Sequence, residues 1–314
     1  MKYLTEVPEH ICKQGDTNYV AYCDTDSAYI NAQPLLEKRH PNFNKLSDTE
    51  KDSLCEEMAL EFQDIITEDY DRLAAECFNV KKSHRLEMKT ECVIRSAYFR
   101  ATRRYAQWIT KREGIDKEKL DIKGLEFMKT NFPTVLGEFF NDILQQALKG
   151  TPKETLISQI KDYKKKILGG EISLKLLGNP TRVTKIDKYK ARKSAGEVFS
   201  TIEKGAPAPV KAAIRYNDLL KLWKLDRKHE LITSASKIKW VYLKDNPYKI
   251  ECLAFIDYDM PKKIEDFLAI YANRQKIFDS ILLNKLTNFF NDLGYSLTLN
   301  PYTEGFDKYL VDVK

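Results

Sequence analysis

Apolar and polar residues alternate around residue 24 in the pattern of two short strands. Val20, Tyr22, Ala28 and Ile30 share one parity, and the most polar positions lie midway between them. Side chains two residues apart lie on the same face of a strand. The pattern therefore predicts a strand, a short turn near residues 24–26, and a second strand, with acidic residues at the tip.

A helical period follows the first pair of strands. Between Ser53 and Cys77, apolar residues recur at intervals of three and four, which predicts an amphipathic helix with an acidic outer face that packs behind a sheet. Alternation returns over Leu86–Arg95, where Glu91 falls on the polar face of a predicted strand, and Tyr98–Ile109 is predicted to be strand as well.

Beyond Gly124 the period is mainly helical. Pro133 to Gly150 predicts one helix, and Thr151-Pro152-Lys153-Glu154 has the form of a capping box that starts a second helix ending near Leu168. These two helices are expected to form a helical hairpin. The elements predicted after them are an irregular basic segment (Gly169–Pro209), a strand (Ile238–Leu243), a turn (Asn246-Pro247) and a long helix (Lys276–Leu293) stopped by Gly294.

Together these elements predict an α+β fold with two domains. The first, residues 1–127, is expected to combine an antiparallel sheet with helices behind it, and the second, residues 128–314, is expected to be mainly helical. A chain of 314 residues with 43% hydrophobic content is long enough to bury two modest cores.

Composition removes several classes of protein. The sequence has no apolar run of eighteen residues and no apolar segment near Met1, so we expect an intracellular protein without a membrane anchor. Its six cysteines contain no Cys-x-x-Cys pair and its four histidines are scattered, which argues against a zinc site or a disulfide framework.

Charge is divided unevenly along the chain. Residues 1–100 contain 13 Lys and Arg against 19 Asp and Glu, whereas residues 101–314 contain 39 against 27. An acidic first part suits a metal-binding centre, and a basic second part suits a surface that follows the phosphates of a nucleic acid. For any single lysine, solvation of a helix surface is the simpler explanation; the sum over the region favours a polyanion partner.

The acidic turn carries the strongest candidate chemistry. Tyr22-Cys23-Asp24-Thr25-Asp26-Ser27 places two carboxylates one residue apart between apolar strands. Magnesium prefers such hard oxygen ligands, and a two-metal phosphoryl-transfer centre needs them close together on rigid elements. Asp-x-Asp by itself is also common in ordinary turns and helix caps, so the flanking residues matter.

These flanking residues resemble the family B DNA polymerases. The Tyr-x-Asp-Thr-Asp-Ser sequence is similar to a palm motif of that family, Thr102-Arg103-Arg104-Tyr105 to its Lys-Lys-Arg-Tyr segment with one lysine missing, and Lys123-Gly124-Leu125-Glu126 to its Lys-Gly-Leu-Glu segment. Shorter matches at Arg215-Tyr216-Asn217 and Asn246-Pro247-Tyr248 resemble the thumb of T-even-type phage polymerases. The resemblance covers most of this chain and about the C-terminal third of a whole polymerase.

The resemblance implies a role for each matched residue. Asp26 is the expected principal metal ligand, Asp24 a supporting carboxylate, and Tyr22, Thr25 and Ser27 shape the turn. Glu91 corresponds to a further acidic residue on a neighbouring palm strand; the alternative is a solvent-facing glutamate paired with Lys89 or Arg95. The residues expected to contact DNA are Arg103, Arg104, Tyr105, Lys123, Gly124, Arg215 and Tyr216.

The same resemblance implies partners and a missing part. It predicts two Mg²⁺ ions, primer-template DNA and a deoxynucleoside triphosphate. The first palm motif with its aspartate, the fingers helix and the exonuclease domain of the family have no match in this sequence. We therefore expect a C-terminal palm-and-thumb subunit of a split polymerase, completed by an N-terminal chain that carries those parts.

Two other functions remain open from the sequence. A non-catalytic DNA-binding remnant of a polymerase would share the basic second domain, and an unrelated two-metal nuclease would use Asp24, Asp26 and Glu91 on their own. Near the C-terminus, Phe306, Tyr309 and Leu310 are candidate anchors for a sliding clamp, although a plain terminal strand fits equally well.

Overall fold

The computed structural model describes residues 13–14, 17–24, 26–80, 84–125, 127, 130–190, 197–297 and 299. Contacts divide the chain into unit 1, Met1–Leu125, and unit 2, Glu126–Lys314. The domain boundary predicted from the sequence, between residues 127 and 128, lies two residues later. The fold is mixed α and β with antiparallel sheets, which is compatible with the predicted α+β class.

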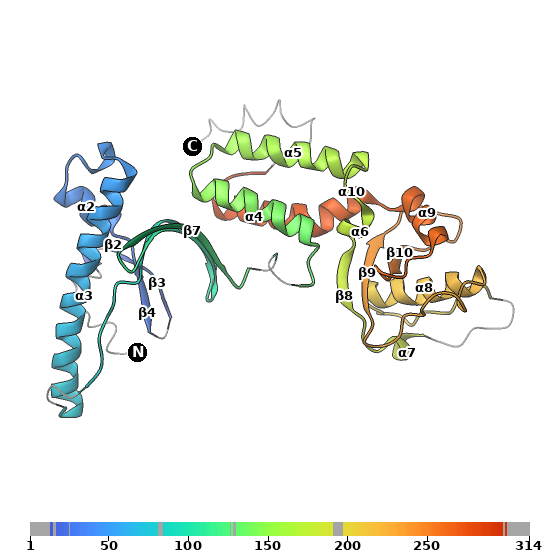
Figure 1. Ribbon diagram of the computed structural model, residues 1–314, viewed down its shortest axis with the longest axis horizontal. Coiled ribbons are helices and arrows are strands. Elements are labelled where there is room, and N and C mark those ends of the chain that lie inside the picture. Colours follow the sequence, from blue (N-terminus) through green and yellow to red (C-terminus); the bar gives the residue numbers. More distant parts are fainter. Residues whose placement is uncertain are drawn as a thin grey trace. The chain divides into compact units, whose positions relative to one another are not determined.

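Unit 1 consists of hairpins and helices (Figure 1). Its strands are β1 (Lys13–Gln14), β2 (Thr17–Asn18), β3 (Val20–Asp24), β4 (Ser27–Ile30), β5 (Cys92–Ala101), β6 (Arg104–Arg112) and β7 (Ile115–Lys123), and its helices are α2 (Gln33–Arg39), a 3₁₀ turn (Phe43–Lys45) and α3 (Asp48–Phe78). Strands β3 and β4 form one antiparallel hairpin, and β5, β6 and β7 form a three-stranded antiparallel sheet. The predicted pair of strands around residue 24 is therefore confirmed.

Helix α3 confirms the predicted amphipathic helix and is longer than predicted (Figure 1). Its start is fixed by a capping box, in which the Glu50 backbone N–H donates to Ser47 Oγ at 3.3 Å and the Ser47 N–H donates to Glu50 Oε2 at 2.8 Å. Leu36, Phe43, Met58 and Phe62 form a buried apolar cluster that joins α3 to α2 and the 3₁₀ turn. The helix is tied to the sheet by an ion pair of 2.7 Å between Lys111 Nζ and Glu56 Oε2.

Two strand predictions in unit 1 are wrong in part. The strand predicted from Leu86 begins only at Cys92, because Thr90 just before it bonds to α3 instead. Its N–H donates to Gln63 Oε1 at 2.8 Å, and its side-chain Oγ1 donates to the Ala59 carbonyl at 3.1 Å. The continuous strand predicted over Tyr98–Ile109 is a hairpin instead. It turns at residues 102–103, where Arg103 adopts a left-handed φ of 59°.

Unit 2 contains helices and a second sheet (Figure 1). Its elements are α4 (Thr134–Leu148), α5 (Lys153–Gly169), α6 (Leu174–Leu177), β8 (Asn179–Arg182), α7 (Ile186–Tyr189), α8 (Ala208–Leu222), β9 (Lys237–Tyr242), β10 (Cys252–Phe255), α9 (Lys262–Tyr271), α10 (Arg274–Ile277), a π-helical segment (Phe278–Leu283) and α11 (Asn284–Asp292). Strands β8, β9 and β10 form an antiparallel sheet, so the expectation of a mainly helical second domain was incomplete. The predicted irregular segment after Gly169 also contains β8 and two short helices.

The predicted helical hairpin of unit 2 is confirmed. Helices α4 and α5 lie side by side (Figure 1), and the rings of Phe139 and Tyr163 stack between them with centroids 3.8 Å apart. Pro152 itself is the N-cap of α5 and no side chain caps the helix, so the predicted capping box at Thr151 is wrong. The Tyr163 hydroxyl donates to the Val135 carbonyl at 3.0 Å, which fixes the two helices at a second point.

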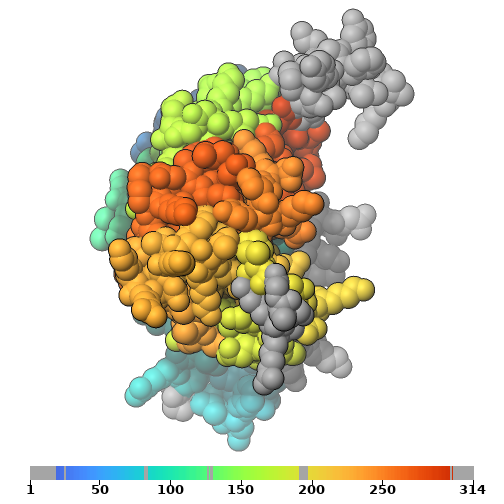
Figure 2. Space-filling model, turned by 90° about the vertical axis from the view of Figure 1, so that its right-hand side faces the viewer, coloured from blue at the N-terminus to red at the C-terminus, as the bar shows by residue number. Residues whose placement is uncertain are grey.

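Helix α8 packs against the sheet of unit 2 and is buried along most of its length. Val210, Ile214, Leu219 and Leu220 are among its buried residues. Figure 2 shows the face of this unit on which the segments from α8 to α10, coloured gold to orange-red, form one continuous surface. Among the described residues, no helix is both long enough and apolar enough to cross a bilayer.

Candidate functional site

The acidic turn lies at the tip of the β3–β4 hairpin. Asp24 pairs with Ser27 across the hairpin, and Asp26 lies in the turn between them. The Asp24 carbonyl accepts a hydrogen bond from the Asp26 N–H at 2.6 Å and a second from Ser27 Oγ at 3.2 Å. Asp26 is exposed and Asp24 is partly buried, and these backbone-directed hydrogen bonds stabilise the turn between them. Thr25 lies outside the described residues.

Arg103 joins this turn from the tip of the β5–β6 hairpin. Its backbone N–H donates to the Tyr22 hydroxyl at 3.0 Å, and its Nε donates to Asp24 Oδ2 at 3.1 Å. The hydrogen bond and the charge of Asp24 raise the pKa of the Arg103 guanidinium. The Asp24 carboxylate therefore already accepts a cation in this structure.

The backbone of Gly124 lies against the carbonyl group of Arg103. A Cβ atom on Gly124 would be 2.1 Å from the Arg103 carbonyl oxygen, and the backbone of Gly124 has a φ of +65°. Both facts exclude any larger residue without a local shift. The sequence suggested that this glycine lets the backbone approach a phosphate, whereas the close approach seen in the structure is to Arg103. Glu126 lies outside the described residues.

Four aromatic rings from β3, β4, β5 and β6 pack together close to the tips of the two hairpins. Tyr22, Tyr29, Phe99 and Tyr105 have ring centroids 5.3–5.8 Å apart, and the hydroxyls of Tyr29 and Tyr105 lie 3.1 Å from each other. Burial, followed by the hydrogen bond to Tyr105, raises the pKa of Tyr29. We call these four residues the aromatic cluster. It fixes the β3–β4 hairpin to the three-stranded sheet.

The other residues of unit 1 that were predicted to contact DNA differ in exposure. Arg104 and Lys123 are exposed at neighbouring positions of β6 and β7, whereas Tyr105 is 5% exposed and belongs to the aromatic cluster. The Lys123 ammonium lies 5.8 Å from the centroid of the Tyr105 ring, and the hydrogen bond with Tyr105 is the largest cause that raises the pKa of Lys123. Tyr105 therefore supports the site, while Arg104 and Lys123 present charge to solvent.

Glu91 does not complete a cluster with the two aspartates. It is exposed just before β5, and its carbonyl accepts a hydrogen bond from the Glu113 N–H at 2.8 Å. Lys89 pairs instead with Glu87, and Arg95 with Asp48 and Asp52. In the part of the chain that the structure describes, no group of three His, Cys, Asp or Glu side chains is placed to hold a metal ion. The turn offers two carboxylates to a cation.

Arg215 and Tyr216, both predicted to contact DNA, lie on α8 and differ in exposure. Tyr216 is fully buried, and its hydroxyl has no hydrogen-bond partner among the described residues. Arg215 Nη1 donates to the Ser200 carbonyl at 2.8 Å and to Asp218 Oδ2 at 3.1 Å, and the guanidinium lies 5.3 Å from the centroid of the Phe199 ring. The Tyr216 side chain has no surface with which to contact DNA.

Asn246 and Tyr248, from the other short match, also have local roles. The Asn246 amide nitrogen donates to the carbonyls of Lys244 at 2.9 Å and Ile250 at 2.7 Å, which closes the turn between β9 and β10. The Tyr248 hydroxyl accepts a hydrogen bond from Trp223 Nε1 at 3.2 Å. These contacts explain the residues as parts of the fold of unit 2.

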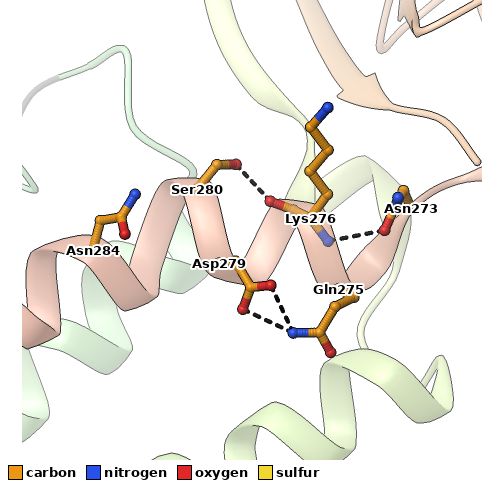
Figure 3. Close-up of a pocket in the computed structure, with 6 residues that line it drawn as sticks. All are labelled: Asn273, Gln275, Lys276, Asp279, Ser280 and Asn284. Carbon is orange, nitrogen blue, oxygen red and sulfur yellow. Dashed lines mark hydrogen bonds between the residues drawn. The ribbon is translucent and has the colours of Figure 1, made fainter.

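A polar depression in unit 2 was not predicted from the sequence. Its volume is about 320 Å³, and its lining residues are Asn273, Gln275, Lys276, Asp279, Ser280 and Asn284 (Figure 3). It lies along the helix that contains the π-helical segment. Gln275 Nε2 donates to both carboxylate oxygens of Asp279 at 2.8 Å, so these two side chains satisfy each other. In the sequence, this depression is indicated only by polar residues at four-residue spacing, Lys276, Ser280 and Asn284, which share one face of a helix.

The fold thus brings together three segments that are far apart in the sequence. Residues 22–27, 103–105 and 123–124 meet at one end of unit 1 through the contacts of Tyr22, Asp24, Arg103 and Gly124. No family model matches the chain, and no curated protein matches it. The geometry of these segments is therefore the main support for a function.

Proposed function

We propose that the chain is the C-terminal palm-and-thumb part of a family B DNA-directed DNA polymerase. In this proposal unit 1 supplies palm carboxylates and unit 2 is the thumb. The observation that carries it is the meeting of the three segments that resemble polymerase motifs. Two of them are bonded directly, with Arg103 Nε 3.1 Å from Asp24 Oδ2, and the third places Gly124 against the Arg103 carbonyl.

The acidic turn fits part of a two-metal centre. Asp26 would be the main ligand because it is exposed at the turn, and Asp24 would support it with an oxygen that already accepts a cation. Magnesium bound there would lower the pKa of the primer 3′-hydroxyl and stabilise the leaving pyrophosphate. The turn supplies two carboxylates, and the resemblance places a further acidic ligand on the first palm motif of the partner chain.

The proposal gives each remaining site residue a role. Arg104 and Lys123 would hold primer-template DNA, because both carry exposed charge at the same end of the sheet. The aromatic cluster and Gly124 would keep the two hairpin tips in register. The groups without a match here, namely the first palm aspartate and the fingers that bind the deoxynucleoside triphosphate, would be supplied by an N-terminal polymerase chain.

Primer extension tests the proposal. The chain is mixed with a polypeptide that carries the exonuclease, fingers and first palm motif, and extension of a labelled primer is measured in Mg²⁺. We expect extension by the mixture, loss of at least 100-fold for Asp26→Asn, and wild-type extension for Glu118→Gln, an exposed acid on β7. Extension that survives Asp26→Asn would refute the assignment.

The rival functions are separate outcomes of the same assay. Mg²⁺-dependent cleavage of DNA by the chain alone would identify a nuclease, and binding to primer-template without extension in any mixture would identify a non-catalytic remnant. The candidate clamp anchors Phe306, Tyr309 and Leu310 lie outside the described residues.

A further inference from the structure

Arg103 has two competing anionic partners at the proposed site. In the structure its guanidinium binds Asp24, and in the proposed function the same end of unit 1 faces the phosphates of DNA. We propose that Arg103 is a switch that couples DNA binding to metal loading. Without DNA it holds Asp24 Oδ2; when it moves to the DNA it leaves that oxygen to a divalent cation. This inference rests on the proposed function.

The backbone of Arg103 is held on both sides, whereas its side chain is mostly exposed. The Arg103 N–H is held by the Tyr22 hydroxyl, and its carbonyl lies against Gly124. In contrast, 74% of the Arg103 side chain is exposed. The guanidinium can therefore change partners by side-chain rotation, without any displacement of the hairpin tip.

The ion pair is of the kind that competition can break. Its acceptor is 29% exposed and its donor is mostly in solvent, and exposed pairs of this type contribute little free energy. A DNA duplex offers a dense row of phosphates, each of which competes for an arginine. Movement of the Arg103 guanidinium from Asp24 to a DNA phosphate therefore requires little desolvation of either side chain.

The pair also opposes metal binding directly. Arg103 Nε donates to Asp24 Oδ2, an oxygen that a divalent cation would need. Its positive charge lowers the negative potential that Asp24 and Asp26 create together. If Arg103 only stabilised the conformation of the turn, its substitution would disorder the two carboxylates and lower the metal affinity. The proposed switch predicts that the substitution raises the metal affinity.

The test measures metal affinity at the turn in the full chain. Mn²⁺ is titrated in, and its affinity is taken from the paramagnetic broadening of the Asp26 and Ser27 amide signals. Without DNA, we expect Arg103→Gln to bind Mn²⁺ about 2- to 5-fold more tightly than wild type. Arg112→Gln removes an equal charge from the opposite end of β6 and should match wild type. Arg103→Lys, which keeps the charge, should lie between them.

Addition of primer-template DNA at fixed free Mn²⁺ completes the test. We expect the gap between wild type and Arg103→Gln to close, because DNA withdraws Arg103 in the wild type. The Arg103 side-chain N–H signal of the wild-type chain should shift on DNA addition, which reports the exchange without any substitution. An affinity of Arg103→Gln equal to or weaker than wild type, or a gap that DNA leaves unchanged, would overturn the switch. Absence of DNA binding by every form would instead refute the proposed function.

Discussion

Arg103 and Gly124 share a space that admits no additional side-chain atom. The positive φ of each residue and the 2.1 Å approach of a Cβ on Gly124 to the Arg103 carbonyl make this the most constrained backbone contact of the candidate site. The residue at position 124 affects the site indirectly, because it sets the position of Arg103, which in turn contacts Asp24. Its substitution is therefore expected to affect stability first and the site second.

Gly124→Ala should destabilise the protein more than a positive φ alone explains. Adoption of a left-handed conformation by alanine costs about 1–2 kcal/mol, and the clash with the Arg103 carbonyl adds to it, so we expect a loss of about 3 kcal/mol in the free energy of unfolding. Gly114→Ala is the matched control, because it has a φ of +77° but only an ordinary contact of 3.6 Å with Glu56. Urea denaturation of both variants measures the difference. Equal losses would show that the Arg103 turn yields to the added atom.

Tyr216→Phe should leave stability unchanged or raise it slightly. The Tyr216 hydroxyl is buried without a partner among the described residues, and burial raises the pKa of that phenol. Removal of an unsatisfied buried group relieves a desolvation cost of about 1 kcal/mol. Urea denaturation measures the stability, and fluorescence anisotropy should show unchanged affinity for primer-template DNA. A clear loss of DNA affinity would restore the contact predicted from the sequence.

At the scale of elements, each unit depends on side chains that join a helix to its neighbour. In unit 2 the α4–α5 hairpin is held by the stacked rings of Phe139 and Tyr163 and by the bond from the Tyr163 hydroxyl to the Val135 carbonyl. Burial, with a smaller contribution from the charge of Glu138, raises the pKa of Tyr163 to about 12. The packing of the hairpin is thus linked to the protonation of one phenol.

This linkage predicts a loss of stability at high pH. An unfolded tyrosine ionises near pH 10, whereas folded Tyr163 keeps its proton to about pH 12. The folded state therefore binds more protons between these values, and the contribution of Tyr163 is complete below pH 10 and falls as pH rises toward 12. The difference in the free energy of unfolding between wild type and Tyr163→Phe should shift in favour of the variant over this range. A difference independent of pH would contradict the raised pKa.

The elements that could be predicted from the sequence are those with one clear apolar stripe and a recognisable end. Helix α3 has both, and the turn at Asp24 follows from strand alternation on either side. Helix α8 was missed because its buried residues include polar ones, Asn217 and Asp218, as well as apolar ones such as Ile214, so residue type does not separate its buried face from its exposed face. The β5–β6 turn was missed because Arg103, rather than glycine or asparagine, adopts the positive φ.

The candidate site shows the same division. The motif residues were identified from their types and order, but their partners depend on contacts between distant segments. The Arg103–Asp24 bond spans 79 positions in the sequence, and the Arg103–Tyr22 bond spans 81. The burial of Tyr216 follows from its place on α8, which the sequence did not reveal. Motif resemblance therefore predicted that Arg215 and Tyr216 contact DNA, but the Tyr216 side chain is buried in the fold.

At the scale of the whole molecule, the uneven charge suits a polyanion partner. The excess of Lys and Arg lies in residues 101–314, which include β6, β7 and all of unit 2. Binding of such a surface to DNA releases counterions, so the affinity should fall steeply with salt. The dependence on salt counts the phosphate contacts and can be assigned to individual residues by substitution.

Arg104→Gln should reduce the salt dependence of primer-template binding. Arg104 is exposed beside the acidic turn, and loss of one phosphate contact lowers the slope of log K against log[salt] by about 1. Arg112→Gln removes an exposed arginine from the other end of the same strand, so its slope should equal that of wild type. Fluorescence anisotropy between 50 and 300 mM salt measures all three proteins. If Arg112→Gln lowers the slope as much as Arg104→Gln, DNA binding depends on the net charge of the sheet and not on a specific contact at the hairpin end. Because both variants lose one charge, only the position of that charge along β6 can account for a difference between them.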